Sequence, residues 1–207
     1  MNKEDVIVFG AGGHGKSVLD VLLSGSKYSV VAFAEKNTKK DECIYGIPIV
    51  DENIAGGLNV KNAIVSIGDN AVRKKVFKKL RNEGYSIINA ISHLAYVSPY
   101  AEIGCGVVVM PFSVVSIGAR VGNGAIINTK ASIDHDTIIG DFCHIAPGST
   151  LCGYVDIGAE SFIGAGSTII DRITVGEKAV VGAGAVVNRD VLARQTVVGV
   201  PAKLITN

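Results

Sequence analysis

An aliphatic residue recurs at every sixth position over almost half of this 207-residue chain, without an interruption. The sixteen positions are Val97, Ile103, Val109, Val115, Val121, Ile127, Ile133, Ile139, Ile145, Leu151, Ile157, Ile163, Ile169, Val175, Val181 and Val187. A small or β-branched residue usually follows four positions later, as at Ala119 and Thr137. Neither an amphipathic helix nor an ordinary strand has this period. Hexapeptide repeats are typical of a parallel β-helix, so we expect residues 96 to 191 to form one, with the aliphatic side chains inside.

The composition restricts the partners that the chain can have. Its 20 basic and 19 acidic residues leave a net charge of +1, which favours neither nucleic acid nor a membrane surface as a partner. We find no signal-like N-terminus and no long apolar span. The four cysteines form no C-x-x-C pair, and Cys105, Cys143 and Cys152 fall in the hexad register where small residues pack. We therefore expect a cytoplasmic protein with reduced cysteines that serve as packing residues.

The first 92 residues are predicted to form a separate small α/β domain, followed by the β-helix and a C-terminal tail in residues 93–207. Apolar runs and helical spacing predict strands at residues 6–9, 30–33 and 63–67 and helices at residues 16–23 and 72–80. The second helix is expected to turn four side chains inward: Val72, Val76, Phe77 and Leu80. Alternating strands and helices predict a parallel sheet, whose ligands bind beyond the carboxyl ends of the strands.

A glycine loop follows the first predicted strand and reads Gly10-Ala11-Gly12-Gly13-His14-Gly15. It fits the G-x-G-x-x-G pattern, and an acid, Glu35, lies about twenty residues on. Backbone N–H groups at the start of the next helix could hold a pyrophosphate. The domain is short for a bound NAD, so a nucleoside diphosphate suits it better; a tight turn without a ligand is the alternative. The substrate-binding residues expected in three converging loops are Gly12, Gly13, His14, Gly15, Glu35, Gly68, Asp69 and Asn70.

Catalytic chemistry is expected where the hexads carry residues that packing does not require. His135 lies between Asp134 and Asp136 at a turn position that is elsewhere mostly small or polar. Because positions eighteen apart stack in this fold, we expect His135 on an outer edge between Ile117 and Gly153. A carboxylate beside the imidazole would hold one tautomer, as a general base requires, and the Gly153 N–H could stabilise an oxyanion. A surface histidine between solvated acids is the alternative.

Several motifs together resemble those of the bacterial nucleotide-sugar acyltransferases of the PglD and NeuD type, over nearly the whole chain. The motifs are the glycine loop, the loop Ile67-Gly68-Asp69-Asn70 with Arg73-Lys74-Lys75 after it, Met110-Pro111, Asn128-Thr129, Asp134-His135-Asp136, His144 and the tail Val198-Gly199-Val200-Pro201-Ala202-Lys203. From spacing alone, His144 is either a ligand contact or a plain surface residue, and it points outward.

The resemblance implies a left-handed β-helix and a homotrimer with active sites between subunits. It implies that His135 is the general base and Asp136 its orienting carboxylate, and that the acceptor attacks the thioester of acetyl-CoA directly. Glu35 and Lys36 stand where relatives hold the uracil or its ribose with an acidic pair, so UDP, GDP and dTDP are all candidate nucleotides. The implied acetyl-CoA contacts are His144, Gly153, Gly182, Ala183, Pro201 and Lys203, and no metal is implied.

The resulting hypothesis is an N-acetyltransferase for bacterial surface glycan or glycoprotein synthesis. Its acceptor would be the amino group of a nucleotide-linked amino sugar, of the 4-amino-4,6-dideoxy kind. Three alternatives remain: an O-acetyltransferase acting on a sialic-acid-like sugar, a non-catalytic sensor or scaffold, and a zinc hydrolyase of the γ-carbonic-anhydrase kind. The last needs three histidines that include a pair five positions apart, whereas His135 and His144 lie nine positions apart.

Overall fold

The structure is a computed structural model that describes residues 3–36, 38–39 and 41–205. The chain divides into two compact units, Met1–His93 and Leu94–Asn207, one residue beyond the boundary drawn from the sequence. Each unit has a buried core of its own. Within the described ranges, no helix is long and apolar enough to cross a membrane.

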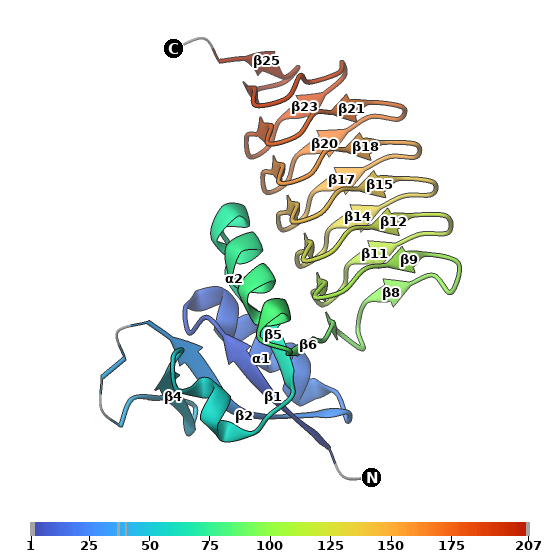
Figure 1. Ribbon diagram of the computed structural model, residues 1–207. Helices are drawn as coiled ribbons and strands as arrows, with labels where there is room; N and C mark the ends of the chain where they lie inside the picture. Colours follow the sequence, from blue (N-terminus) through green and yellow to red (C-terminus); the bar gives the residue numbers. More distant parts are fainter. Residues whose placement is uncertain (1–2, 37, 40, 206–207) are drawn as a thin grey trace. The chain divides into compact units, whose positions relative to one another are not determined.

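The N-terminal unit is built on one twisted sheet (Figure 1). The strands of this sheet are β1 (Glu4–Phe9), β2 (Tyr28–Glu35), β3 (Cys43–Ile44), β4 (Ile47–Asp51), β5 (Asn62–Val65) and β6 (Ser86–Ile87). The short strand β7 (Ala90–Ile91) follows β6 in the chain and is not part of this sheet. The sheet order is β3-β4-β2-β1-β5-β6, and all neighbours are parallel except β3 and β4. The chain leaves central β1 first to one side and later to the other. Ligands of such sheets bind beyond the carboxyl ends of the strands at this switch point.

Two helices and one short 3-10 helix connect these strands. They are α1 (Gly13–Ser24), α2 (Asn70–Asn82) and η1 (Ala55–Leu58). The prediction for the inward face of α2 was wrong at Val72, which is 48% exposed, whereas Phe77 and Leu80 are buried. The physical reason is Arg73, which is only 1% exposed and donates to the carbonyl oxygen of Ile67. Because Arg73 turns inward, the buried stripe is shifted by about one residue.

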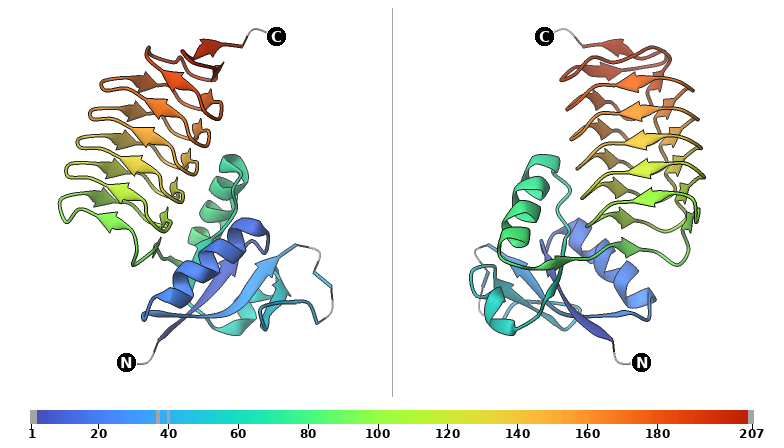
Figure 2. Two further views of the ribbon diagram at one scale, coloured as in Figure 1. Left: turned by 180° about the vertical axis from the view of Figure 1, so that it is seen from behind. Right: turned by 45° about the vertical axis from the view of Figure 1, so that its right-hand side comes forward.

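The C-terminal unit is a left-handed parallel β-helix with three faces, and the rungs stack one above another (Figure 2). Face 1 contains β10 (Val108–Val109), β13 (Ile126–Ile127), β16 (His144–Ile145), β19 (Phe162–Ile163), β22 (Val180–Val181) and β24 (Thr196–Val198), with β25 (Lys203–Leu204) antiparallel at its end. Face 2 contains β8 (Tyr96–Val97), β11 (Val114–Val115), β14 (Ser132–Ile133), β17 (Thr150–Leu151), β20 (Thr168–Ile169) and β23 (Val186–Val187). Face 3 contains β9 (Glu102–Ile103), β12 (Arg120–Val121), β15 (Ile138–Ile139), β18 (Asp156–Ile157) and β21 (Thr174–Val175).

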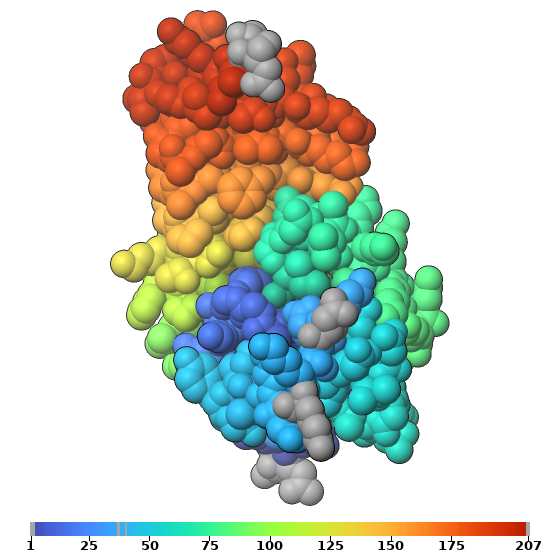
Figure 3. All heavy atoms as spheres, turned by 90° about the vertical axis from the view of Figure 1, so that its left-hand side faces the viewer, coloured from blue at the N-terminus to red at the C-terminus, as the bar shows by residue number. Residues whose placement is uncertain are grey.

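The hexad register predicted from the sequence is confirmed. The aliphatic position is at most 3% exposed in every hexad from Val109 to Val187. Positions eighteen apart pair in parallel, as Ile133 does with Leu151. Burial of one such side chain stabilises the fold by about 1.5–3 kcal/mol. The small position also ties coils together, because the Ser149 hydroxyl donates to the Gly164 carbonyl at 2.9 Å. Figure 3 shows the C-terminal coils packed in contiguous layers.

All four cysteines are free thiols, and they differ in their surroundings. Cys143 is buried and Cys152 is half-buried, in keeping with the packing role expected from the hexad register. Cys105 is exposed, so the expectation of a packing role was wrong there. Its position lies on a turn, where the backbone N–H donates to the Asn123 side chain and the thiol is left at the surface.

Candidate functional site

His135 and Asp136 lie on the edge where the chain passes from face 2 to face 3, here called the 2–3 edge. The imidazole Nδ1 lies 2.9 Å from the Asp136 carboxylate Oδ2. The His135 backbone N–H donates to Asp134 Oδ1 at 2.7 Å, which holds the turn. The side chains of His135 and Asp136 are 45% and 48% exposed. The carboxylate therefore binds Nδ1 and leaves Nε2 available to accept a proton from a bound molecule.

Neighbouring coils place His135 between Ile117 and Gly153, as the eighteen-residue register requires. The Asp136 N–H donates to the Ile117 carbonyl, and the Tyr154 N–H donates to the His135 carbonyl, each at 3.1 Å. A Cβ added at Gly153 would lie 2.6 Å from His135 Cε1 and 2.7 Å from Nε2. The imidazole thus rests directly on the Gly153 backbone, a contact that only glycine allows.

Tyr154 and Arg172 continue this edge beyond His135. The Tyr154 ring meets the imidazole edge to face, with centroids 5.2 Å apart. The Arg172 guanidinium lies 4.8 Å from the centre of the Tyr154 ring. Sequence reasoning missed both residues, although counting eighteen positions onward from Asp136 leads to Tyr154 and then to Arg172.

His144 lies on face 1, away from the 2–3 edge. Its Nε2 lies 3.1 Å from the Asn128 amide nitrogen, and its ring meets Phe162 edge to face at 5.2 Å. In a triangular coil, face 1 is the face opposite the 2–3 edge. A single chain therefore does not bring His144 and His135 together.

Four further acetyl-CoA candidates gather at the C-terminal end of the β-helix. Gly182 and Ala183 follow β22 on the edge between faces 1 and 2, and a Cβ added at Gly182 would lie 2.6 Å from Val198 Cγ1. Val198 in turn pairs with Lys203 across the β24–β25 hairpin, which Pro201 closes. These candidates share an edge with each other and not with His135.

The structure brings the three predicted loops of the N-terminal unit together. The Ala11 N–H donates to Glu35 Oε2 at 3.0 Å, so the loops after β1 and β2 touch. The Ser66 hydroxyl, after β5, donates to the Gly10 carbonyl at 2.7 Å. A Cβ at Gly15 would collide with the Gly10 carbonyl oxygen, so glycine is required there for packing.

Two further glycines of the loop, Gly12 and Gly13, are not explained by packing. A Cβ added at Gly12 or Gly13 would meet no atom within 4 Å. Both residues are exposed, Gly12 is the N-cap of α1, and His14 in the first helical turn is half-buried. Open backbone at a helix N-terminus lets an anion approach closely.

Glu35 has a role in the fold that the sequence did not reveal. Its two carboxylate oxygens accept the backbone N–H groups of Ala11 and Lys36, at 3.0 and 2.9 Å. The Lys36 ammonium lies 3.8 Å from Glu52. Since a carboxylate has about four acceptor sites, Glu35 could still accept a hydrogen bond from a hydroxyl group of a ligand.

The loop Gly68-Asp69-Asn70 is held by its own helix. Asp69 is the N-cap of α2 and accepts the Val72 N–H at 2.8 Å. Arg73 donates to the Gly68 carbonyl at 2.9 Å and to Asn70 Oδ1 at 2.7 Å. Asp69 and Asn70 therefore shape the loop. Arg73 supports it, Ser66 supports the glycine loop, and neither is among the site residues that the sequence predicts.

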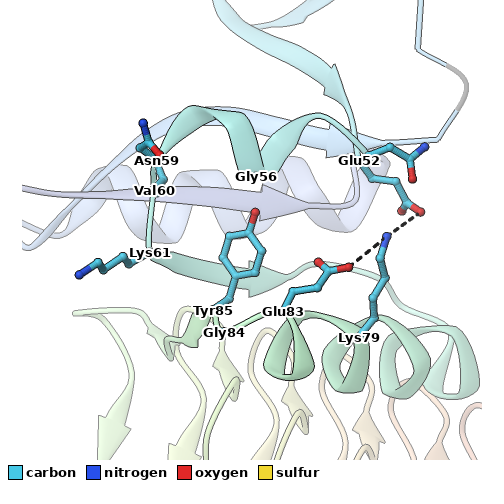
Figure 4. Close-up of a pocket in the computed structure, with 10 residues that line it drawn as sticks. Glu52, Gly56, Asn59, Val60, Lys61, Lys79, Glu83, Gly84 and Tyr85 are labelled. Atoms are coloured by element: carbon cyan, nitrogen blue, oxygen red, sulfur yellow. Dashed lines mark hydrogen bonds and ion pairs between the residues drawn. The ribbon is translucent and has the colours of Figure 1, made fainter.

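A separate hollow of about 480 Å³ opens in the N-terminal unit between η1 and the end of α2 (Figure 4). The Tyr85 hydroxyl points toward Gly56 across it, and burial raises the pKa of Tyr85, with a smaller contribution from Glu83. Lys79 bridges Glu52 and Glu83 at 3.3 and 3.9 Å. None of the predicted site residues lines this hollow.

The described ranges contain no group of three or more His, Cys, Asp or Glu side chains arranged to hold a metal ion. The 2–3 edge offers an imidazole, its carboxylate partner and the backbone N–H of Gly153. These groups can remove a proton from an attacking nucleophile and stabilise an oxyanion, which is the chemistry of acyl transfer.

Three family models match the chain. Residues 5–80 match the PglD N-terminal domain. Residues 118–153 match the bacterial transferase hexapeptide (six repeats), and residues 154–189 match the hexapeptide repeat of succinyl-transferase.

Individual relatives agree with these matches. A histidine-to-asparagine mutant of perosamine N-acetyltransferase from Caulobacter crescentus, solved in complex with CoA and GDP-perosamine, is 36% identical, with a TM-score of 0.94 over 98% of this chain and 97% of that chain. The acetyltransferase domain of PglB from Neisseria gonorrhoeae, in complex with acetyl coenzyme A, is 33% identical, with a TM-score of 0.91 over 99% and 100%. GDP-perosamine N-acetyltransferase from Escherichia coli O157:H7 is 28% identical over 158 residues, which are 72% of this chain and 71% of that protein. The chain belongs to the PglD-type hexapeptide-repeat family of acetyl-CoA-dependent nucleotide-sugar N-acetyltransferases.

Proposed function

We propose that this enzyme acetylates the amino group of a GDP-linked amino sugar of the perosamine kind, with His135 as the general base. The observation that carries the proposal is the 2.9 Å contact between His135 Nδ1 and Asp136 Oδ2 on an exposed edge. The GDP assignment is supported by the relatives from Caulobacter crescentus and Escherichia coli, whose names or bound ligands include GDP-perosamine. Because these relatives are N-acetyltransferases, an amine is favoured over the hydroxyl acceptor of the O-acetyltransferase alternative.

In the proposed mechanism, the sugar amine attacks the thioester carbonyl of acetyl-CoA directly. His135 Nε2 removes a proton from the attacking nitrogen, while Asp136 holds the tautomer in which Nδ1 carries the hydrogen. The carbonyl oxygen becomes an oxyanion, and the Gly153 N–H stabilises it. The C–S bond then breaks, the amide forms, and the departing CoA thiolate takes up a proton. Acetyl-CoA is the cosubstrate, and no step requires a metal.

The division of the predicted residues over two sides of the β-helix supports a trimer with sites between subunits. His144 on face 1 and His135 on the 2–3 edge can serve one reaction only if neighbouring chains supply them. Face 1 also carries partly exposed apolar side chains on the coils that follow His144: Phe162 and Val180 are each 36% exposed and Val198 is 39% exposed. Such a strip suits a subunit contact. In the same proposal, the glycine loop and Glu35 hold the nucleotide, and Gly182, Ala183, Pro201 and Lys203 flank the coenzyme. A cytoplasmic location is part of the proposal.

The test is a His135→Asn variant assayed for release of the CoA thiol with GDP-, UDP- and dTDP-linked amino sugars. General-base catalysis contributes about 10²–10⁴-fold, so kcat should fall by that factor while the mass of the assembly by light scattering stays unchanged. Unaltered kcat would overturn the role of His135, and a preference for UDP or dTDP would overturn the nucleotide assignment.

A mixing arm tests the intersubunit site. Co-refolding His135→Asn chains with His144→Ala chains should restore part of the activity, because mixed trimers contain some sites with both histidines intact. No recovery beyond the sum of the two variants would contradict a shared site.

A further inference from the structure

Gly118 lies one coil before Asp136 and faces its carboxylate. A Cβ added at Gly118 would lie 2.6 Å from Asp136 Oδ1, the oxygen that does not bind His135. The same coil is joined to Asp136 by the backbone hydrogen bond from Asp136 N–H to the Ile117 carbonyl, at 3.1 Å. The carboxylate therefore occupies the space that a side chain at position 118 would fill.

Backbone conformation does not explain why this residue is glycine. Gly118 has φ +72° and lies in the left-handed region. The residues that stack on it in the next three coils share that region: Asp136 has φ 56°, Tyr154 φ 58° and Arg172 φ 60°. Because this column accepts an aspartate, a tyrosine and an arginine, the turn itself tolerates side chains. What glycine uniquely provides at position 118 is room for the Asp136 carboxylate.

The geometry points to Gly118 as a positioning residue for the His135–Asp136 pair. With no side chain at 118, the carboxylate lies along the edge, with Oδ1 over Gly118 and Oδ2 on His135 Nδ1. A methyl group there would displace the carboxylate, whose far end is free to turn toward solvent because the side chain is 48% exposed. His135 would then lose the acceptor that holds its tautomer, although the coil would keep its path.

Gly118 and Gly153 thus enclose the pair from its two sides. Gly153 leaves room for the imidazole and Gly118 leaves room for its carboxylate. The expected effect of Gly118 on kcat rests on the proposed function, in which His135 is the general base. Its structural effect, a change in the tautomer of His135, is independent of that role.

The experiment compares Gly118→Ala with Gly166→Ala. Gly166 is also left-handed, with φ +66°, but a Cβ there would meet no atom within 4 Å. We expect Gly118→Ala to lower kcat by about tenfold or more, with an unchanged KM for acetyl-CoA, and Gly166→Ala to leave kcat near that of the unmodified enzyme. In an Asp136→Ala background, adding Gly118→Ala should change kcat less than about twofold, because its target has been removed.

A spectroscopic measurement separates this inference from the proposed function. In ¹⁵N spectra of the histidine rings, the ring hydrogen of His135 should lie mainly on Nδ1 in the unmodified protein and in Gly166→Ala. In Gly118→Ala, this hydrogen should be distributed over both ring nitrogens. An unchanged tautomer in Gly118→Ala would overturn the inference, as would a loss of kcat that persists in full without Asp136. If the tautomer changes in Gly118→Ala but the His135→Asn substitution leaves kcat unaltered, the positioning role of Gly118 is upheld and His135 is refuted as the base.

Discussion

Replacing Gly153 by alanine should damage catalysis without unfolding the β-helix. The added Cβ would stand 2.6 Å from His135 Cε1, whereas carbon atoms in contact are separated by about 3.5 Å. The imidazole must therefore move by roughly 0.9 Å, the difference between these two values. The ring is the far end of a side chain that is 45% exposed, so it can move without disturbing the core.

The size of the effect follows from this displacement. A misplacement of about 1 Å can cost about 10²-fold in rate, so kcat should fall about 100-fold, equivalent to ~2.7 kcal/mol in the barrier. Alanine keeps the backbone N–H, so this loss would measure the position of His135 rather than the removal of the oxyanion donor. The affinity for the nucleotide sugar should change little, because the residues proposed to hold its nucleotide lie in the N-terminal unit.

The assay is the rate of CoA thiol release, combined with thermal unfolding and with calorimetric titration of the nucleotide sugar. Gly57→Ala is the matched control, because a Cβ at Gly57 would meet no atom within 4 Å. A Gly153→Ala enzyme with the kcat of the unmodified protein would refute the reasoning. So would a loss of kcat accompanied by an equally large loss of unfolding free energy, since that result would indicate damaged packing.

Two further predictions concern Glu35 and the cysteines. Glu35→Gln should weaken binding of the nucleotide sugar about tenfold, because an amide has one acceptor oxygen and cannot bind both the Ala11 and Lys36 N–H groups as the carboxylate does. Titration calorimetry with Glu4→Gln as a surface control measures this, and equal affinities for the two variants would contradict it. Burial raises the pKa of the Cys152 thiol, with smaller contributions from Asp134 and Asp171, so less thiolate is present at pH 8 than in an ordinary cysteine. Peptide mass spectrometry after iodoacetamide treatment should show slower alkylation of Cys152 than of exposed Cys105 at pH 8, with the gap narrowing as the pH rises; equal rates at pH 8 would refute the shift.

The β-helix could be predicted almost completely from one periodic signal. Ile133 pairs with Leu151 and lies inside because every hexad repeats the same geometry, so one register decides all coils. The N-terminal unit has no such repeat. Its main strands were found, but β3, β4 and β6 were not, and the inward face of α2 was misplaced at Val72. Short strands depend on tertiary contacts, which local spacing does not contain. The phase of α2 depends on Arg73, whose guanidinium turns back to the carbonyl oxygens of Ile67 and Gly68, and apolar spacing gives no sign of that contact.

The candidate site, too, could be predicted only in part from the sequence. The register placed His135 beside Gly153, because stacking at eighteen residues follows from the repeat. The same count applied to Asp136 leads to Gly118, yet only the direction of the carboxylate reveals why glycine stands there. The assignment of Glu35 to the glycine loop likewise depends on a hydrogen bond between strands that are separate in the chain.

Periodicity was thus sufficient for the path of the backbone and for which side chains face inward, since both repeat with the coil. The orientation of each outward side chain depended on the folded chain. An outward group on an exposed edge is not constrained by the repeat; its neighbours one coil away decide where it lies. For the His135–Asp136 pair those neighbours are two glycines, whose missing side chains leave the space that both groups occupy.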